Sequence, residues 1–170
     1  MKRIASIQDV SCLGRCSQTV ALPVVSTMGV ECAILPTAVL STHTSFPDFR
    51  CLDLTDQLLP VARHWKAQGV RFDALYTGYL ASDRQVAVVL ELLELLREEG
   101  TLLFVDPAMA DHGKLYAGFG PEFPALMAQV VSKAQITVPN ITEASLMTGL
   151  PYREDYDEAY VKALLRGVAA

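Results

Sequence analysis

The sequence alternates short apolar runs of strand length with longer amphipathic stretches of helix length. This alternation is typical of a parallel β-sheet whose strands are joined by crossover helices. A chain of 170 residues is long enough for one compact domain with a sizeable core, and two full domains would not fit. The sequence therefore predicts a single α/β unit. Its strands are expected at 3–8, 31–36, 73–78, 101–106 and 135–139.

The stretches between these strands predict helices. The clearest covers 83–99, where Ser82 and Gln85 have the spacing of a capping box. A second helix is expected within 54–68, although it contains Pro60, which helices tolerate only near the first turn or at a kink. Further helices are expected at 17–28, 122–132 and 155–165.

Composition excludes several classes of protein. No stretch approaches the roughly 18 to 20 consecutive apolar residues of a membrane span, so we expect a cytoplasmic protein. The formal net charge of -5 argues against a nucleic-acid partner. Hydrophobic residues make up 51% of the chain, slightly more than in an ordinary soluble domain. The four cysteines include no Cys-x-x-Cys pair, and we expect them to be reduced.

Small and polar residues follow each predicted strand. In an α/β sheet, ligands bind at the carboxyl ends of the strands, so these residues are candidates for a binding site. Three carboxylates, Asp9, Asp106 and Glu143, occur in this position. Carboxylate oxygens at strand ends suit Mg²⁺ held together with nucleotide phosphates.

Asp106 and Glu143 are the best candidates for the metal. Asn140 could bind a metal-bound water or a phosphate oxygen, and the amides at the start of the helix near Thr142 favour an anion. A purely structural interpretation stays open for each residue. Glu143 is then a first-turn helix acid, Asn140 a turn former, and Asp106 the residue before a loop proline.

Five motifs in sequence order carry a resemblance to a known family. They are SIQD, STHT, TGYLAS, VDPAM and VPNITEASLMTG. Together they resemble the vitamin B6 kinases, which phosphorylate pyridoxal, pyridoxine and pyridoxamine and belong to the ribokinase-like superfamily. The resemblance runs over 3–149. It implies a three-layer α/β sandwich with a mostly parallel sheet, ATP and Mg²⁺ as cofactors, and a homodimer that acts in the cytoplasm.

The resemblance implies roles for two groups of residues. By matching position, Thr44 and Ser45 contact the pyridine substrate, Tyr79 lines its pocket, and His43 and Asp9 lie in the same region. The residues expected to bind the nucleotide are Asp106, Val138, Asn140 and Glu143, with Asp106 and Glu143 also placed to hold the metal.

Asp9 is the first departure from the family pattern. The best-known pyridoxal kinases resemble SIQS here, with a serine that contacts the substrate, whereas this chain has a carboxylate. A carboxylate can pair with a protonated pyridine nitrogen or an amine, which favours pyridoxamine or an aminopyrimidine over pyridoxal. The hydroxymethylpyrimidine kinases of thiamin synthesis, which resemble this chain in having Asp after the first strand, are therefore the alternative.

The second departure is an absence. The family keeps its catalytic base on a Gly-x-Gly-Asp motif, and the nearest string here, GFGP at 118–121, has proline where aspartate is required. No catalytic residue is therefore assigned. We expect 1–170 to be the N-terminal part of one kinase domain, truncated before its C-terminal strands and inactive alone. A non-catalytic fragment that binds a ligand or pairs with a partner is the remaining alternative.

Overall fold

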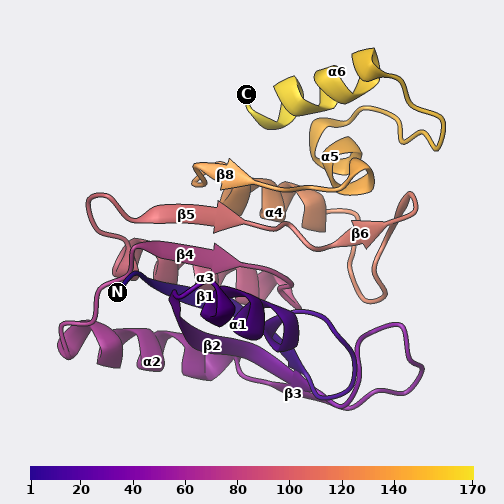
Figure 1. The fold of residues 1–170 in the computed structure, drawn as a ribbon. Helices are drawn as coiled ribbons and strands as arrows, with labels where there is room; N and C mark the ends of the chain where they lie inside the picture. Colours follow the sequence, from indigo (N-terminus) through magenta and orange to yellow (C-terminus); the bar gives the residue numbers. More distant parts are fainter.

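The computed structural model describes residues 1–170, and its centre is a six-stranded sheet (Figure 1). The strand order is β3-β2-β1-β4-β5-β8, and every neighbouring pair is parallel except β2 and β3. A separate two-stranded ribbon, β6 and β7, follows β5 in the sequence. The strands are β1 (Arg3–Ser11), β2 (Glu31–Leu40), β3 (Cys51–Asp53), β4 (Ala74–Thr77), β5 (Leu102–Val105), β6 (Ala110–Asp111), β7 (Lys114–Leu115) and β8 (Ile136–Thr137).

All five predicted strands are present, and the α/β class with a mostly parallel sheet is confirmed. The prediction missed β3, a three-residue exposed strand that pairs antiparallel with the end of β2. It also missed the β6–β7 ribbon. With two or three residues, β3, β6 and β7 are too short for an alternating apolar pattern to be recognised in the sequence. Each forms because the fold places a pairing partner beside it.

Six helices connect and flank the strands. All five predicted helices are found with shifted ends, and the helix expected to start near Thr142 begins one residue earlier. Pro60 lies inside its helix and is accommodated there. The helices are α1 (Gln18–Thr27), α2 (Thr55–Ala67), α3 (Asp83–Leu96), α4 (Phe123–Val131), α5 (Ile141–Thr148) and α6 (Glu158–Val168).

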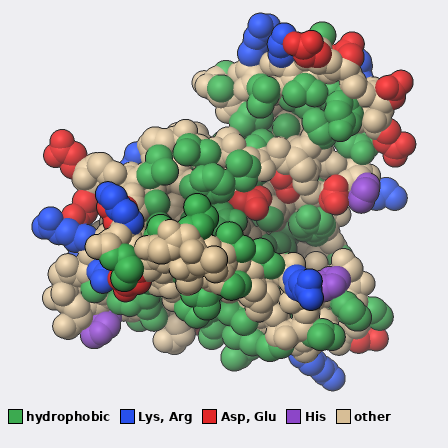
Figure 2. Space-filling view, viewed as in Figure 1, with side chains coloured by type: hydrophobic (Ala, Val, Ile, Leu, Met, Phe, Trp, Pro, Cys, Tyr) green, Lys and Arg blue, Asp and Glu red, His purple; other side chains and the backbone are tan.

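The two faces of the sheet are covered unequally. Ile7, Leu35, Leu75 and Leu103 face α2, α3 and α4 and form a core of 21 buried residues with them. The opposite face carries α1, seen in front of the sheet in Figure 1. Exposed apolar side chains, including Ile34, remain on that face, and Figure 2 shows many apolar groups on this side of the molecule.

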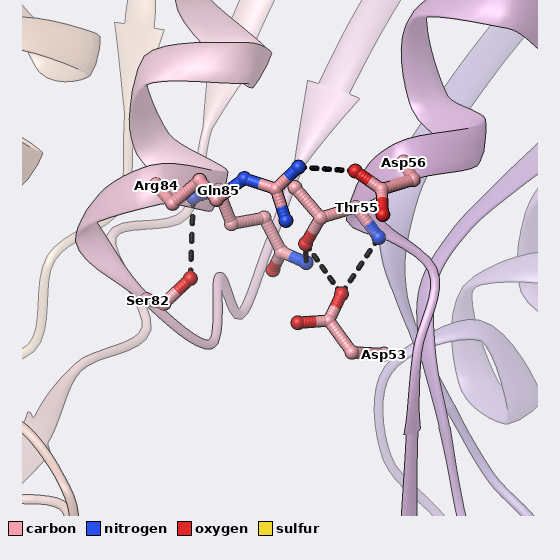
Figure 3. Close-up of polar contacts among 6 residues, drawn as sticks. All are labelled: Asp53, Thr55, Asp56, Ser82, Arg84 and Gln85. Atoms are coloured by element: carbon pink, nitrogen blue, oxygen red, sulfur yellow. Dashed lines mark hydrogen bonds and ion pairs between the residues drawn. The ribbon is translucent and has the colours of Figure 1, made fainter.

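A buried glutamine joins the start of α3 to the neighbouring elements (Figure 3). The Ser82 hydroxyl caps α3 by accepting a hydrogen bond from the Gln85 amide at 3.2 Å. In a capping box the Gln85 side chain would also accept a hydrogen bond from the Ser82 amide. Here it accepts one from the amide of the preceding residue, Ala81. The side-chain amide group of Gln85 donates to the Thr37 carbonyl and the Thr55 hydroxyl, which ties α3 to β2 and α2.

Two further contacts in Figure 3 fix the start of α2. Asp53 accepts hydrogen bonds from the amide and the hydroxyl of Thr55. Asp56 forms an ion pair with Arg84 on α3. These contacts join the start of α2 to β3 and to α3. None of the six helices combines the length and apolarity needed to cross a membrane.

Candidate active site

The main cavity of the molecule has a volume of about 670 Å³ and lies at the carboxyl ends of β1, β4 and β5, beside α1. Its position agrees with the rule that α/β sheets bind ligands at this edge. Six of the predicted site residues line it: Asp9, His43, Thr44, Ser45, Tyr79 and Asp106. The cavity therefore brings together the residues assigned to the pyridine substrate and one residue assigned to the nucleotide.

Asp9 is a buried carboxylate near the end of β1. Only 3% of the residue is exposed, and Ser11 donates its hydroxyl hydrogen to Asp9 Oδ2 at 3.0 Å. No lysine, arginine or histidine forms an ion pair with Asp9. A buried carboxylate is costly unless it is paired or hydrogen-bonded, so a cationic or hydrogen-donating ligand would be favoured beside it.

Tyr79 follows β4 and contributes an aromatic ring to the cavity wall. Burial, followed by the charge of Asp9, raises the pKa of Tyr79 to about 12, so its hydroxyl stays protonated at neutral pH. Gly78 precedes it, and a Cβ at that position would lie 2.7 Å from Gln8 Oε1. A side chain at this position would therefore have to displace the side chain of Gln8 on β1.

His43 connects two loops of the cavity wall. Its ring packs edge-on against Phe46 with centroids 4.8 Å apart, and its Nδ1 accepts a hydrogen bond from the Ser45 amide at 3.4 Å. A Cβ at Gly14 would lie 2.9 Å from the His43 ring, so the β1–α1 loop approaches this ring closely. The hydroxyls of Thr44 and Ser45 form no intramolecular hydrogen bond and are free for a ligand.

Asp106 directly follows β5 and is a half-buried carboxylate in the cavity. Burial raises the pKa of Asp106. No hydrogen bond or ion pair occupies its oxygens. Tyr116 lines the same cavity. Burial and then the charges of Glu143, Asp111 and Asp106 raise the pKa of its hydroxyl.

Glu143 and Asn140 form the capping box of α5, outside the cavity lining. Glu143 is 2% exposed, and its two oxygens accept hydrogen bonds from the amides of Met109, at 3.2 Å, and Asn140, at 2.8 Å. Burial raises the pKa of Glu143 to about 7, although these amide hydrogen bonds act in the opposite direction. Asn140 accepts from the Glu143 amide and donates to the Ala110 carbonyl.

Glu143 is therefore the first-turn helix acid of the structural interpretation, whereas Asn140 is the N-cap of α5 rather than a turn former. The charge of Asp106 also raises the pKa of Glu143, so the two carboxylates lie within electrostatic range on the same rim. Val138 lies after β8 with 47% of its surface exposed. The nucleotide-binding and metal-binding roles of these residues stay predictions.

The donor atoms on this rim fit Mg²⁺ in part. No cluster of three or more histidine, cysteine or acidic residues forms a ready-made metal site. Mg²⁺ usually keeps several waters and takes only one or two carboxylates from the protein. The Asp106 oxygens are free for that purpose, whereas those of Glu143 already accept backbone amides.

The structure adds residues that the sequence did not single out. They come from α1 and its preceding loop, from the β4 strand, and from the ribbon and loop after β5. Several of them lie next to the motifs in the sequence, but only the fold shows which of these side chains line the cavity. These residues include Arg15, Cys16, Val20, Val24, Tyr76, Asp111 and Tyr116.

The chain is similar to pyridoxal kinases over most of its length. The pyridoxal kinase of Arabidopsis thaliana is 30% identical over 169 residues, which cover 96% of this chain and 54% of that protein. Pyridoxal kinase PdxY of Haemophilus influenzae is 27% identical over 180 residues, covering 99% of this chain and 61% of that protein. The chain thus spans a little over half the length of these two curated relatives. No family model matches it.

Solved structures have the same fold. A Bacteroides thetaiotaomicron protein, provisionally named a phosphomethylpyrimidine kinase and crystallised with pyridoxal, is 40% identical with a TM-score of 0.94. That match covers 99% of this chain and 59% of the other. The pyridoxal kinase of Lactobacillus plantarum is 36% identical with a TM-score of 0.87, covering 98% of this chain and 60% of the other.

The fold matches that of these solved kinases, so the chain has a ribokinase-like fold. Within that class the chain is a homologue of the vitamin B6 kinases, which confirms the resemblance carried by the motifs.

Proposed function

We propose that the chain forms the substrate pocket and part of the nucleotide site of an ATP-dependent vitamin B6 kinase. The reaction transfers the γ-phosphoryl group of ATP to the hydroxymethyl group of pyridoxal, pyridoxine or pyridoxamine. The observation that supports it most directly is the single cavity that gathers Asp9, Thr44, Ser45, Tyr79 and Asp106. A flat heterocycle suits such a cavity, with an aromatic wall and several free polar groups.

Each group of residues has a proposed role. Asp9, Thr44 and Ser45 bind polar groups on the ring, and Tyr79 packs against it. Asp106 binds Mg²⁺ directly or through water, and Mg²⁺ would neutralise charge on the transferred phosphoryl group. Glu143 holds the loop after Asp106 in place through the Met109 amide, so it supports the metal site from behind.

The 170 residues contain no Gly-x-Gly-Asp motif, and we propose that this chain alone does not turn over at a useful rate. Phosphoryl transfer depends on positioning and on charge stabilisation, which a base and the amides of such a loop would supply. A general base alone contributes about 10² to 10⁴ in rate. Binding of a vitamer by the chain does not require this motif.

A hydroxymethylpyrimidine kinase is the second candidate. The unpaired Asp9 carboxylate in the cavity favours it, because an aminopyrimidine offers N–H donors to this side chain. The Bacteroides thetaiotaomicron protein is named for that activity but was crystallised with pyridoxal. A non-catalytic binding role is the third possibility, and it predicts vitamer binding without turnover in any form of the protein.

The decisive experiment is an ADP-release assay with pyridoxal, pyridoxine, pyridoxamine and hydroxymethylpyrimidine. It compares the 170-residue chain with the same chain joined to the unmatched segment of the Bacteroides thetaiotaomicron protein. We expect the chimera to phosphorylate B6 vitamers and the chain alone to be inactive or nearly so. Preference for hydroxymethylpyrimidine would establish the second candidate. Turnover with none of the four, in either protein, would contradict both kinase assignments.

A further inference from the structure

Phe119 packs against Tyr79, a residue of the cavity wall. The two ring centroids are 5.6 Å apart and the ring planes are inclined by 37°. Phe119 itself is not among the residues that line the cavity. On its other side Phe119 stacks on Phe123, with centroids 3.8 Å apart and an angle of 6° between the planes. Three aromatic rings therefore connect the cavity wall to the interior.

The inner end of this row is fixed by the core. Phe123 is the first residue of α4, is 1% exposed, and belongs to the main hydrophobic cluster. Phe119 lies in the loop between β7 and α4 and follows Gly118, whose φ of 96° favours glycine. Stacking on the buried Phe123 ring thus fixes the position of Phe119, although Phe119 lies in an irregular loop.

The same loop places another aromatic residue in the cavity. Tyr116 lines the cavity, and its amide donates to the Met109 carbonyl at 2.9 Å. The Phe119 amide donates to the Tyr116 carbonyl at 3.3 Å. One turn therefore carries a residue that lines the cavity, Tyr116, and a second ring that packs against Tyr79. No motif in the sequence connects Phe119 to the substrate site.

We propose that Phe119 is a positioning residue of the vitamer pocket, which holds the Tyr79 ring at the cavity wall and so raises the affinity for a flat heteroaromatic substrate. The inference rests on the proposed function, because it takes the cavity to bind a B6 vitamer. Binding against a side chain that is already ordered loses less conformational entropy than binding against a mobile one. The Phe119 ring does not line the cavity, and its contact with the cavity wall is the one with the Tyr79 ring.

A double-mutant cycle tests this dependence. Calorimetry with pyridoxamine gives the Kd of the unaltered chain, Phe119→Ala, Tyr79→Ala and the double variant. We expect Phe119→Ala to raise the Kd by about 2- to 10-fold, the scale of one aromatic pair. Tyr79→Ala should raise it at least as much, and the double variant should bind no more weakly than Tyr79→Ala. A residue that only stabilises the fold would not show this dependence.

Matched variants separate the ring from its apolar volume. Phe119→Tyr keeps the ring and should restore the unaltered Kd, whereas Phe119→Leu keeps apolar volume and should not. Phe49→Ala removes a partly exposed phenylalanine outside the cavity and should leave the Kd unchanged. Thermal unfolding monitored by circular dichroism checks that each variant is folded.

Three results would overturn the proposal: an unchanged Kd for Phe119→Ala, full restoration by Phe119→Leu, or effects of the two alanine substitutions that multiply. If the unaltered chain binds pyridoxamine and the variants behave in one of these ways, only the role of Phe119 fails. If the unaltered chain binds no B6 vitamer, the proposed function fails together with this inference.

Discussion

Asp106 and Glu143 follow neighbouring strands of one sheet, yet their surroundings differ. Asp106 lies in the cavity with no hydrogen-bond partner, whereas Glu143 is 2% exposed and accepts backbone amides on both oxygens. The first carboxylate has free capacity for a ligand, and the second is committed to the start of α5. The comparison shows that the position after a strand does not define a ligand, because the partners already present decide what each carboxylate can bind.

The largest expected difference between the two residues is in stability. Glu143→Ala leaves the amides of Met109 and Asn140 without their acceptor, and should lower the free energy of unfolding by about 2 to 3 kcal/mol. Asp106→Ala removes no hydrogen bond and should change it by less than about 0.5 kcal/mol. Urea unfolding followed by circular dichroism measures both. Equal losses would show that the contrast drawn from hydrogen bonding is wrong.

The second expected difference is in pH dependence. The pKa of Glu143 is raised from 4.5 to about 7 in the folded chain, so the folded state binds a proton that the unfolded state releases between these values. This group therefore contributes stability that is present below about pH 4.5 and lost as the pH rises to about 7, with a slope below about 1.4 kcal/mol per pH unit.

Subtracting the profile of Glu143→Gln, which cannot titrate, isolates this contribution. Unfolding free energies measured from pH 4.5 to pH 8 should show the difference between the two proteins falling and then levelling off. Stability differences that stay flat over this range would show that Glu143 does not titrate in it.

The third prediction concerns ligand binding by Asp106. Asp106→Asn keeps the shape of the side chain and removes its charge, so it should weaken binding of magnesium-ATP by roughly ten-fold without loss of stability. Calorimetry with and without Mg²⁺ measures the change. Asp48→Asn, an exposed substitution outside the cavity, is the charge-matched control. Identical affinities for the unaltered chain and Asp106→Asn would remove Asp106 from the metal site.

The smallest effect is expected at Asp9. One of its oxygens accepts the Ser11 hydroxyl, so its hydrogen bonding is intermediate between that of Asp106 and that of Glu143. Asp9→Ser should shift the preference from pyridoxamine toward pyridoxal by a few-fold, on the order of one charge-assisted hydrogen bond. The ratio of the two dissociation constants measures this shift independently of turnover. A ratio that does not move would exclude Asp9 from the specificity of the pocket.

The sequence predicted the sheet and its helices because apolar periodicity is a local property. The strand-end rule located Asp9 and Asp106 in the cavity, and the family resemblance located His43, Thr44, Ser45 and Tyr79. The sequence could not decide between the two interpretations of Glu143, because capping and metal binding place the same residue types at the same spacing. Tyr116 and Phe119 were not predicted, because their proximity to Tyr79 depends on how a loop folds back after β7.

The irregular pairing of β1 with β2 has a consequence for engineering the pocket. Gln8 pairs with Pro36 but Val10 pairs with Val39, so β2 has one more residue than β1 in the interval that contains Asp9. Such a bulge turns nearby side chains to a new direction. The direction of the Asp9 carboxylate therefore depends on an extra residue in the adjacent strand, so substitutions in β2 at Thr37 and Ala38 belong to the design of this pocket although neither residue lines it.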